Sequence, residues 1–180
     1  MFRSFCFFLV LTVFSVGLCG ASFAAGSIGV VDVVKILNVS DAAKNIQMQR
    51  DSIRESFLSE ISKAEQALRI EEKNLLDLRA KLSQEDYMAK RQVYEARLLV
   101  IRKEAQHKKR RLEVGSAKAM DILRDALYEA VQGIANERGF ELVISNKNVI
   151  AGEKSLDITG ETLERLNSTL PKIPLEIEKE

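Results

Sequence analysis

Residues 68–98, LRIEEKNLLDLRAKLSQEDYMAKRQVYEARL, form the middle of the span that decides the fold of this chain. The whole span runs from Val30 to Val114 without a glycine or a proline, and it is rich in Ala, Leu, Glu, Lys, Arg and Gln. These residue types favour helix, and glycine and proline are the usual helix terminators. The sequence therefore predicts that most of this span is long helix.

Apolar residues recur on both sides of Ser83 at steps of mostly three, four or seven, which is the spacing of a coiled-coil seam. The two series are Ile46, Ile53, Phe57, Ile61, Ala64, Leu68, Leu75, Leu78 and Leu82, then Tyr87, Tyr94, Leu98, Ile101, Ala105, Leu112, Ala119, Ile122, Ala126 and Ile134. Ser83 and Asp86 resemble a capping box, although a continuous helix could also carry residues 83–86. We predict an antiparallel helical hairpin over residues 39–138, with Ser40 as its N-cap and Gly139 as its stop.

The segments that flank this arm have strand-like composition. Ser27 to Val34 and Phe140 to Ser145 are apolar and β-branched, and we expect residues 149–151 to pair antiparallel with the second segment. A short amphipathic helix follows from Glu161 to Leu170. The expected fold class is α+β, with a small β-sheet body built from residues 25–38 and 139–170 that carries the coiled-coil arm. Residues 171–180, which begin at Pro171 and are charged, are predicted to form a disordered tail.

The first residues have the features of a signal peptide. Arg3 precedes an apolar run from Phe5 to Val16, and Ser22-Phe23-Ala24 has the small residues of a cleavage site. We predict a signal peptide over residues 1–24 and a periplasmic mature chain; an uncleaved anchor is the alternative. Both cysteines, Cys6 and Cys19, lie in this leader, so the mature chain would have no disulfide and no thiolate ligand. Oligomerisation is then the expected source of extra stability.

Charge is nearly balanced overall, with 27 Lys and Arg against 26 Asp and Glu, but it is unevenly distributed. A basic stretch lies in the second half of the arm, and the C-terminal region is acidic. The candidate residues for binding acidic clients or an anionic surface are Arg91, Arg97, Arg102, Lys103, Lys108, Lys109, Arg110 and Arg111. A solvated helix face is the plain alternative for such a stretch. Nucleic acid is not expected as a partner, because the chain carries an export signal and lacks interleaved aromatic residues.

Catalytic chemistry is almost absent from the sequence. The single histidine, His107, lies among cations that oppose a metal or a proton, and no phosphate-binding loop, dinucleotide fingerprint or nucleophile elbow occurs. Asp32 interrupts an apolar strand, and we expect it to be satisfied at a strand end or across a subunit contact, with catalysis the remote alternative. We therefore expect no enzyme activity, no catalytic residue, no metal and no cofactor.

The order of these parts resembles one known family, the Skp (OmpH-like) periplasmic chaperones. The resemblance rests on Ile28-Gly-Val-Val-Asp after the leader, the long helical excursion, Phe140-Glu-Leu-Val-Ile-Ser, and a closing Asp157-Ile158-Thr159 that opens the last helix. It covers nearly all of the mature chain.

The resemblance implies a homotrimer with a barrel-like body, from which three helical arms project around a cavity. In that family, unfolded outer-membrane β-barrel proteins are held in the cavity without ATP, and the basic residues lie on the returning helix. Anionic lipid or lipopolysaccharide head groups are a further implied partner. The alternative function is a structural coiled-coil envelope protein that tethers or spaces membranes.

Overall fold

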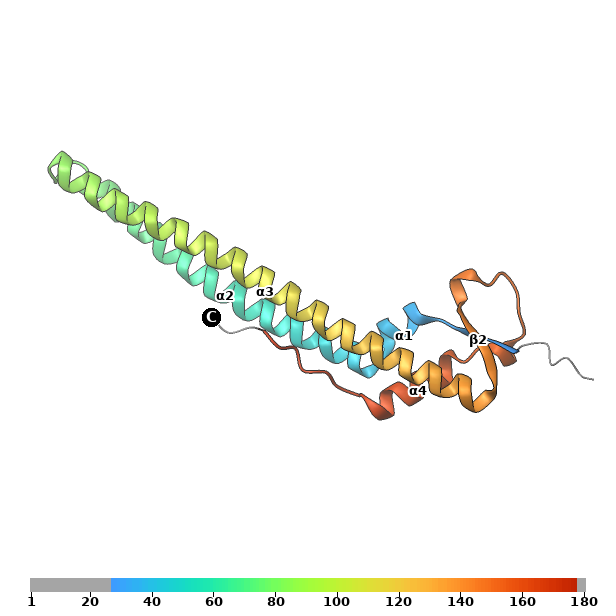
Figure 1. The fold of residues 1–180 in the computed structure, drawn as a ribbon. Coiled ribbons are helices and arrows are strands. Elements are labelled where there is room, and N and C mark those ends of the chain that lie inside the picture. The colour runs from blue at the N-terminus through green and yellow to red at the C-terminus, as the bar shows by residue number, and fades with distance from the viewer. Residues whose placement is uncertain (1–26, 178–180) are drawn as a thin grey trace, which may run out of the picture.

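The computed structural model describes residues 27–177 and consists of a long two-helix arm on a small α+β body (Figure 1). The elements follow the order β1 (Ser27–Val31), α1 (Val33–Val39), α2 (Asp41–Leu78), α3 (Gln84–Arg138), β2 (Phe140–Ser145), two short 3-10 turns and α4 (Thr159–Thr169). The predicted signal peptide lies outside the described residues.

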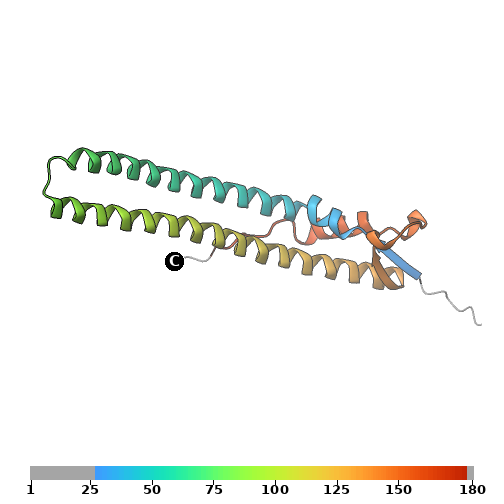
Figure 2. The same cartoon turned by 90° about the horizontal axis from the view of Figure 1, so that it is seen from above.

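Helices α2 and α3 run antiparallel and lie side by side in both views (Figure 2). They contain 38 and 55 residues, which at 1.5 Å per residue correspond to roughly 57 and 83 Å. Because α3 is the longer helix, its C-terminal end extends beyond the start of α2 and packs against the body.

Local capping sets the ends of the arm helices as predicted. The Ser40 hydroxyl accepts a hydrogen bond from the backbone N–H of Ala43, and the Ser83 hydroxyl accepts one from Asp86. Gly139 ends α3 in the left-handed region at φ 68°, where glycine has no Cβ penalty. The hairpin turn at Ser83 is therefore confirmed, and the continuous-helix alternative is wrong.

The apolar seam of α2 is confirmed, since every residue predicted for it is buried or partly buried. The seam of α3 is confirmed except at Ile122, since its other predicted members are buried or partly buried. Ile122 is 51% exposed, whereas Leu123 and Leu127 are completely buried. The reason is that this part of α3 no longer faces α2 alone, because it also meets α1, β2 and α4.

The sheet consists of β1 and β2 paired in parallel, with Ile28 opposite Leu142 and Val30 opposite Ile144. The predicted antiparallel hairpin to residues 149–151 is wrong, and the Ile150 side chain is fully exposed. The chain instead forms two 3-10 turns and returns to the other edge of β1, where the Ile158 N–H donates to the Val30 carbonyl at 2.9 Å. Burial of Ile158, which is 1% exposed, favours this route.

Strand β1 is shorter than predicted because Asp32 begins a helix. Its carboxylate accepts a hydrogen bond from the Lys35 N–H at 2.9 Å, which makes it the N-cap of α1. Val33 and Val34 therefore belong to α1 and not to the strand. The backbone N–H of Asp32 also donates to the Thr159 hydroxyl at 2.9 Å. The expectation that Asp32 is satisfied at a strand end is confirmed.

One apolar core joins the body to the root of the arm. Its largest fully buried side chains come from α1, α3, the segment before α4, α4 itself and the C-terminal segment; they are Ile36, Leu123, Leu127, Ile134, Ile158, Leu166 and Ile173.

The prediction of a disordered tail is wrong for residues 171–177. Figures 1 and 2 show this segment running back from α4 along the arm. Ile173 and Leu175 are 1% and 8% exposed, because they pack into the core cluster at the arm root.

Acid is expected to loosen the junction between β1 and α4. Asp157 accepts a hydrogen bond from the Thr159 N–H at 2.9 Å, and hydrogen bonding to Thr159 holds the pKa of this carboxyl below its usual value. A carboxyl whose pKa is lowered by folding stabilises the fold above its unfolded pKa, and this contribution is lost as pH falls through the folded pKa. Asp157→Ala should lower the free energy of unfolding by about 1 kcal/mol at pH 7. Thermal unfolding should show the two proteins converging below about pH 4; a difference independent of pH would contradict this assignment.

Candidate functional site

Two ion pairs across the hairpin show the register of the arm. Arg97 on α3 lies 3.0 Å from Glu71 on α2, and Lys108 pairs with Glu60. Moving from Arg97 to Lys108 advances eleven positions, and moving from Glu71 to Glu60 goes back eleven, so both pairs share one antiparallel register. The hydrogen bond from Lys108 also holds the pKa of the Glu60 carboxyl below its usual value.

The candidate basic residues fall into three groups. Arg97 and Lys108 pair across the arm, and the Lys108 ammonium lies 5.2 Å from the centre of the Phe57 ring. Arg91 and Lys109 pair along α3, with Glu95 at 2.8 Å and Glu113 at 3.9 Å. Arg111 is half-buried, whereas Arg102, Lys103 and Arg110 are exposed and form no ion pair within residues 27–177. Arg102, Lys103 and Arg110 are therefore the cations most available to a partner.

The arm also exposes large apolar side chains along its length. Those more than half exposed are Met48, Leu58, Ile70, Leu76, Val93, Leu99, Val100, Ile122 and Tyr128. Two helices can bury only the stripe that faces the other helix, so these residues stay in contact with water. Apolar side chains that stay in contact with water in this way are available to a partner.

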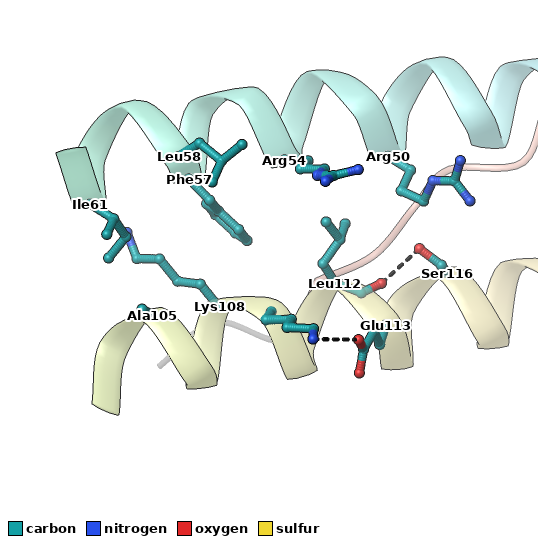
Figure 3. A pocket seen from close by; sticks show the side chains of 11 residues that line it. Arg50, Arg54, Phe57, Leu58, Ile61, Ala105, Lys108, Leu112, Glu113 and Ser116 are labelled. Atoms are coloured by element: carbon teal, nitrogen blue, oxygen red, sulfur yellow. Dashed lines mark hydrogen bonds and ion pairs between the residues drawn. The ribbon is translucent and has the colours of Figure 1, made fainter. Parts of the chain in front are cut away.

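A groove of about 850 Å³ opens between α2 and α3 near the arm root (Figure 3). Phe57 and Leu112 point into it from opposite helices, and Leu58 and Ile61 extend its apolar wall. The cations at its rim are Arg50, Arg54, Lys108 and Lys109. The groove therefore has an apolar floor and a largely basic edge.

A second groove of about 420 Å³ lies nearer the arm tip, between Leu68 on α2 and Leu98 and Ile101 on α3. Tyr94 and Arg102 line it as well. Burial, followed by the nearby Glu72 carboxylate, raises the pKa of the Tyr94 phenol, which is therefore neutral at physiological pH. This groove combines apolar walls with a hydrogen-bonding hydroxyl.

Two other kinds of functional feature are absent from the part of the chain that the structure describes. Within residues 27–177, no helix is long and apolar enough to span a membrane. The same residues contain no group of three or more His, Cys, Asp or Glu that could hold a metal ion.

Sequence reasoning located the basic stretch of α3 but did not include Arg50 and Arg54, which line the larger groove, and missed how the arm root is built. It did not assign roles to Gln49 and Gly115 on the arm, which contact the C-terminal segment, and it did not predict that Ile173 and Leu175 pack there. The alternating apolar pattern of Ile173, Leu175 and Ile177 was the available signal. The charged residues beside this pattern led instead to the prediction of a disordered tail.

Comparisons with known proteins agree with this architecture. The family model described as outer membrane protein (OmpH-like) matches residues 27–166. The structure of a proposed outer membrane chaperone (OmpH-like) from Caulobacter crescentus superimposes with a TM-score of 0.80, covering 87% of this chain and 92% of that one at 15% identity. No curated protein sequence matches the chain. Since the family model covers most of the chain, from β1 into α4, this protein belongs to the OmpH-like family.

Proposed function

We propose that this protein is an ATP-independent holdase chaperone of the periplasm, which binds unfolded outer-membrane β-barrel proteins between helical arms and prevents their aggregation. The observation that carries the proposal is the arm itself, which leaves Leu58, Leu99 and Val100 more than half exposed and carries a groove with a largely basic edge. A folded protein retains such a surface at a cost in solubility, so a partner that covers it is the physical explanation.

The arrangement suits a client without a fixed shape. Exposed apolar side chains and two shallow grooves offer many weak contacts along the arm, and simultaneous weak contacts produce tight overall binding. The exposed cations Arg102, Lys103 and Arg110 would attract acidic clients and speed their encounter. Such binding needs no nucleotide and no catalytic residue.

We further propose a homotrimer. The sheet has only two strands, and a sheet of this size is marginal on its own. Ile28 and Leu142 are register partners and are 41% and 53% exposed, which leaves an apolar pair available for a subunit contact. Residues 25–38 and 139–170 would then form the trimerisation body, and residues 39–138 the arm. Export would use a signal peptide cleaved after Ala24.

The exposed cations also provide a possible surface for anionic lipid or lipopolysaccharide head groups, which basic clusters attract by charge. This contact would bring a loaded chaperone close to the membrane. It requires only that cations such as Lys103 and Arg110 remain accessible in the assembled protein.

Native mass spectrometry tests the holdase directly. The leaderless protein is mixed with an outer-membrane β-barrel protein diluted from urea, without nucleotide. The expected species is a complex of three subunits with one client. A bare oligomer beside aggregated client would contradict the holdase and favour the coiled-coil tether.

A further inference from the structure

Residues 171–177 cross the arm root as an extended strap with a two-residue repeat. Ile173 and Leu175 are buried and Ile177 is partly buried, whereas Lys172 and Glu176, on the alternate positions, are exposed. Alternation of this kind is the pattern of a half-buried β-strand. The strap therefore presents one apolar edge to the arm.

The arm holds the strap through its backbone. The Gln49 side-chain amide donates to the Ile173 carbonyl at 2.8 Å, and its oxygen accepts from the Leu175 N–H at 3.0 Å. One side chain thus supplies the pair of hydrogen bonds that a neighbouring strand would supply. Recognition of this type reads main-chain groups and does not depend on the exact sequence of the bound segment.

Gly115 allows the strap to approach α3 closely. A Cβ atom at this position would lie 2.5 Å from the Glu176 carbonyl oxygen and 3.3 Å from the Leu175 side chain. Glycine in a helix interior costs stability. At Gly115 this cost in stability is offset by the contact that the extended backbone of the strap makes with the helix. We call this contact site, together with Gln49, the seat of the strap.

This seat lies beside the groove of Figure 3. Arg50 and Ser116, which line the groove, are the chain neighbours of Gln49 and Gly115. Ile177 and Phe57 pack against the same apolar core. The groove rim is basic, and the sequence of the strap continues through Glu176, Glu178 and Glu180. The apolar residues of the strap thus match the apolar floor of the groove, and its acidic residues match the basic rim.

We propose that the Gln49–Gly115 seat and the adjoining groove bind extended polypeptide segments with alternating apolar and acidic residues, and that the C-terminal strap is their internal competitor. The identity of the external occupant rests on the proposed function, because strands of outer-membrane β-barrels alternate apolar and polar residues. An unoccupied chaperone would then cover its own binding seat. A client segment would displace the strap.

The test measures binding of a fluorescent peptide of residues 171–180 to the full chain by anisotropy. Ile173→Ser with Leu175→Ser removes the apolar anchors of the strap and leaves the seat unchanged. We expect this variant to bind the peptide at least ~10-fold more tightly than the unmodified chain, because the seat is no longer occupied. Adding Gln49→Ala to this variant should abolish the gain in peptide affinity.

The matched control is Lys172→Ser with Glu176→Ser, which changes the exposed positions of the same strap and preserves its net charge. It should bind the peptide as weakly as the unmodified chain does. Equal peptide affinity of the anchor variant and the unmodified chain would overturn the proposal.

A second measurement uses the unmodified chain and therefore does not depend on the variant folding. Hydrogen–deuterium exchange of residues 171–177 should become faster when an unfolded β-barrel client is present in excess. If the client is held in solution while exchange of the strap stays unchanged, the competitor proposal fails and the holdase stands. If the peptide binds the released seat but clients still aggregate, the seat stands and the holdase fails.

Discussion

Reversal of three exposed arm cations, R102E with K103E and R110E, is expected to slow the capture of acidic unfolded β-barrel clients roughly ten- to a hundredfold at low salt. These side chains form no ion pair within residues 27–177, so their reversal leaves the cross-arm pairs of Arg97 and Lys108 in place. The effect should fall mainly on the association rate, since exposed charges steer encounter more than they hold the complex. Stopped-flow fluorescence of a labelled client measures it.

The matched control reverses three exposed cations away from the basic stretch, with K44E, K147E and K154E. Its change in net charge is identical, so a general electrostatic effect would slow both variants equally. In 1 M salt, where charges are screened beyond about 3 Å, the arm variant should approach the unmodified protein. Unchanged capture by the arm variant at low salt would contradict the electrostatic part of the proposed mechanism.

Truncation of the core should have the largest effect on stability. Leu123 is completely buried on α3 where that helix meets the body. Leu123→Ala removes its apolar contacts and leaves a cavity, which should lower the free energy of unfolding by about 2–5 kcal/mol. Leu99→Ala makes the same chemical change on the same helix at a site that is 57% exposed. Its effect on unfolding should stay within about 0.5 kcal/mol.

Urea unfolding followed by circular dichroism measures both variants, at one fixed subunit concentration because assembly adds to apparent stability. The comparison also separates the two roles of α3. Leu123 serves the fold, whereas Leu99 is available to a client, so Leu99→Ala should weaken client holding without lowering stability. Equal stability loss in the two variants would mean that the exposed arm surface is structural.

Sequence analysis succeeded for the arm helices, whose ends have local causes. Ser40, Ser83 and Gly139 act within a few residues of themselves, and each ends or begins a helix as predicted. The seam of α2 depends only on repeated spacing against a single partner helix. The seam of α3 was wrong only at Ile122, where Leu123 is buried instead because α1, β2 and α4 also meet this part of the helix.

The candidate site was only partly predictable for the same reason. Composition located the basic stretch, but the division of its cations into cross-arm pairs and exposed residues required the antiparallel register. Arg97 and Arg102 are both arginines on one helix, yet only Arg97 has a carboxylate opposite it at 3.0 Å. Spacing along one helix cannot specify what the returning helix places opposite.

The sequence by itself determined the α+β class, the hairpin arm, its turn and its caps, because helix propensity and capping act between residues close together in the chain. Only the tertiary structure decided that β1 pairs in parallel with β2, that Ile158 and not Ile150 enters the core, and that the C-terminal strap docks at Gln49 and Gly115. These features depend on contacts between segments more than fifty residues apart along the chain, or on the burial of one apolar residue in place of another. They are settled by which arrangement buries more apolar surface and satisfies more backbone groups, which no local pattern specifies.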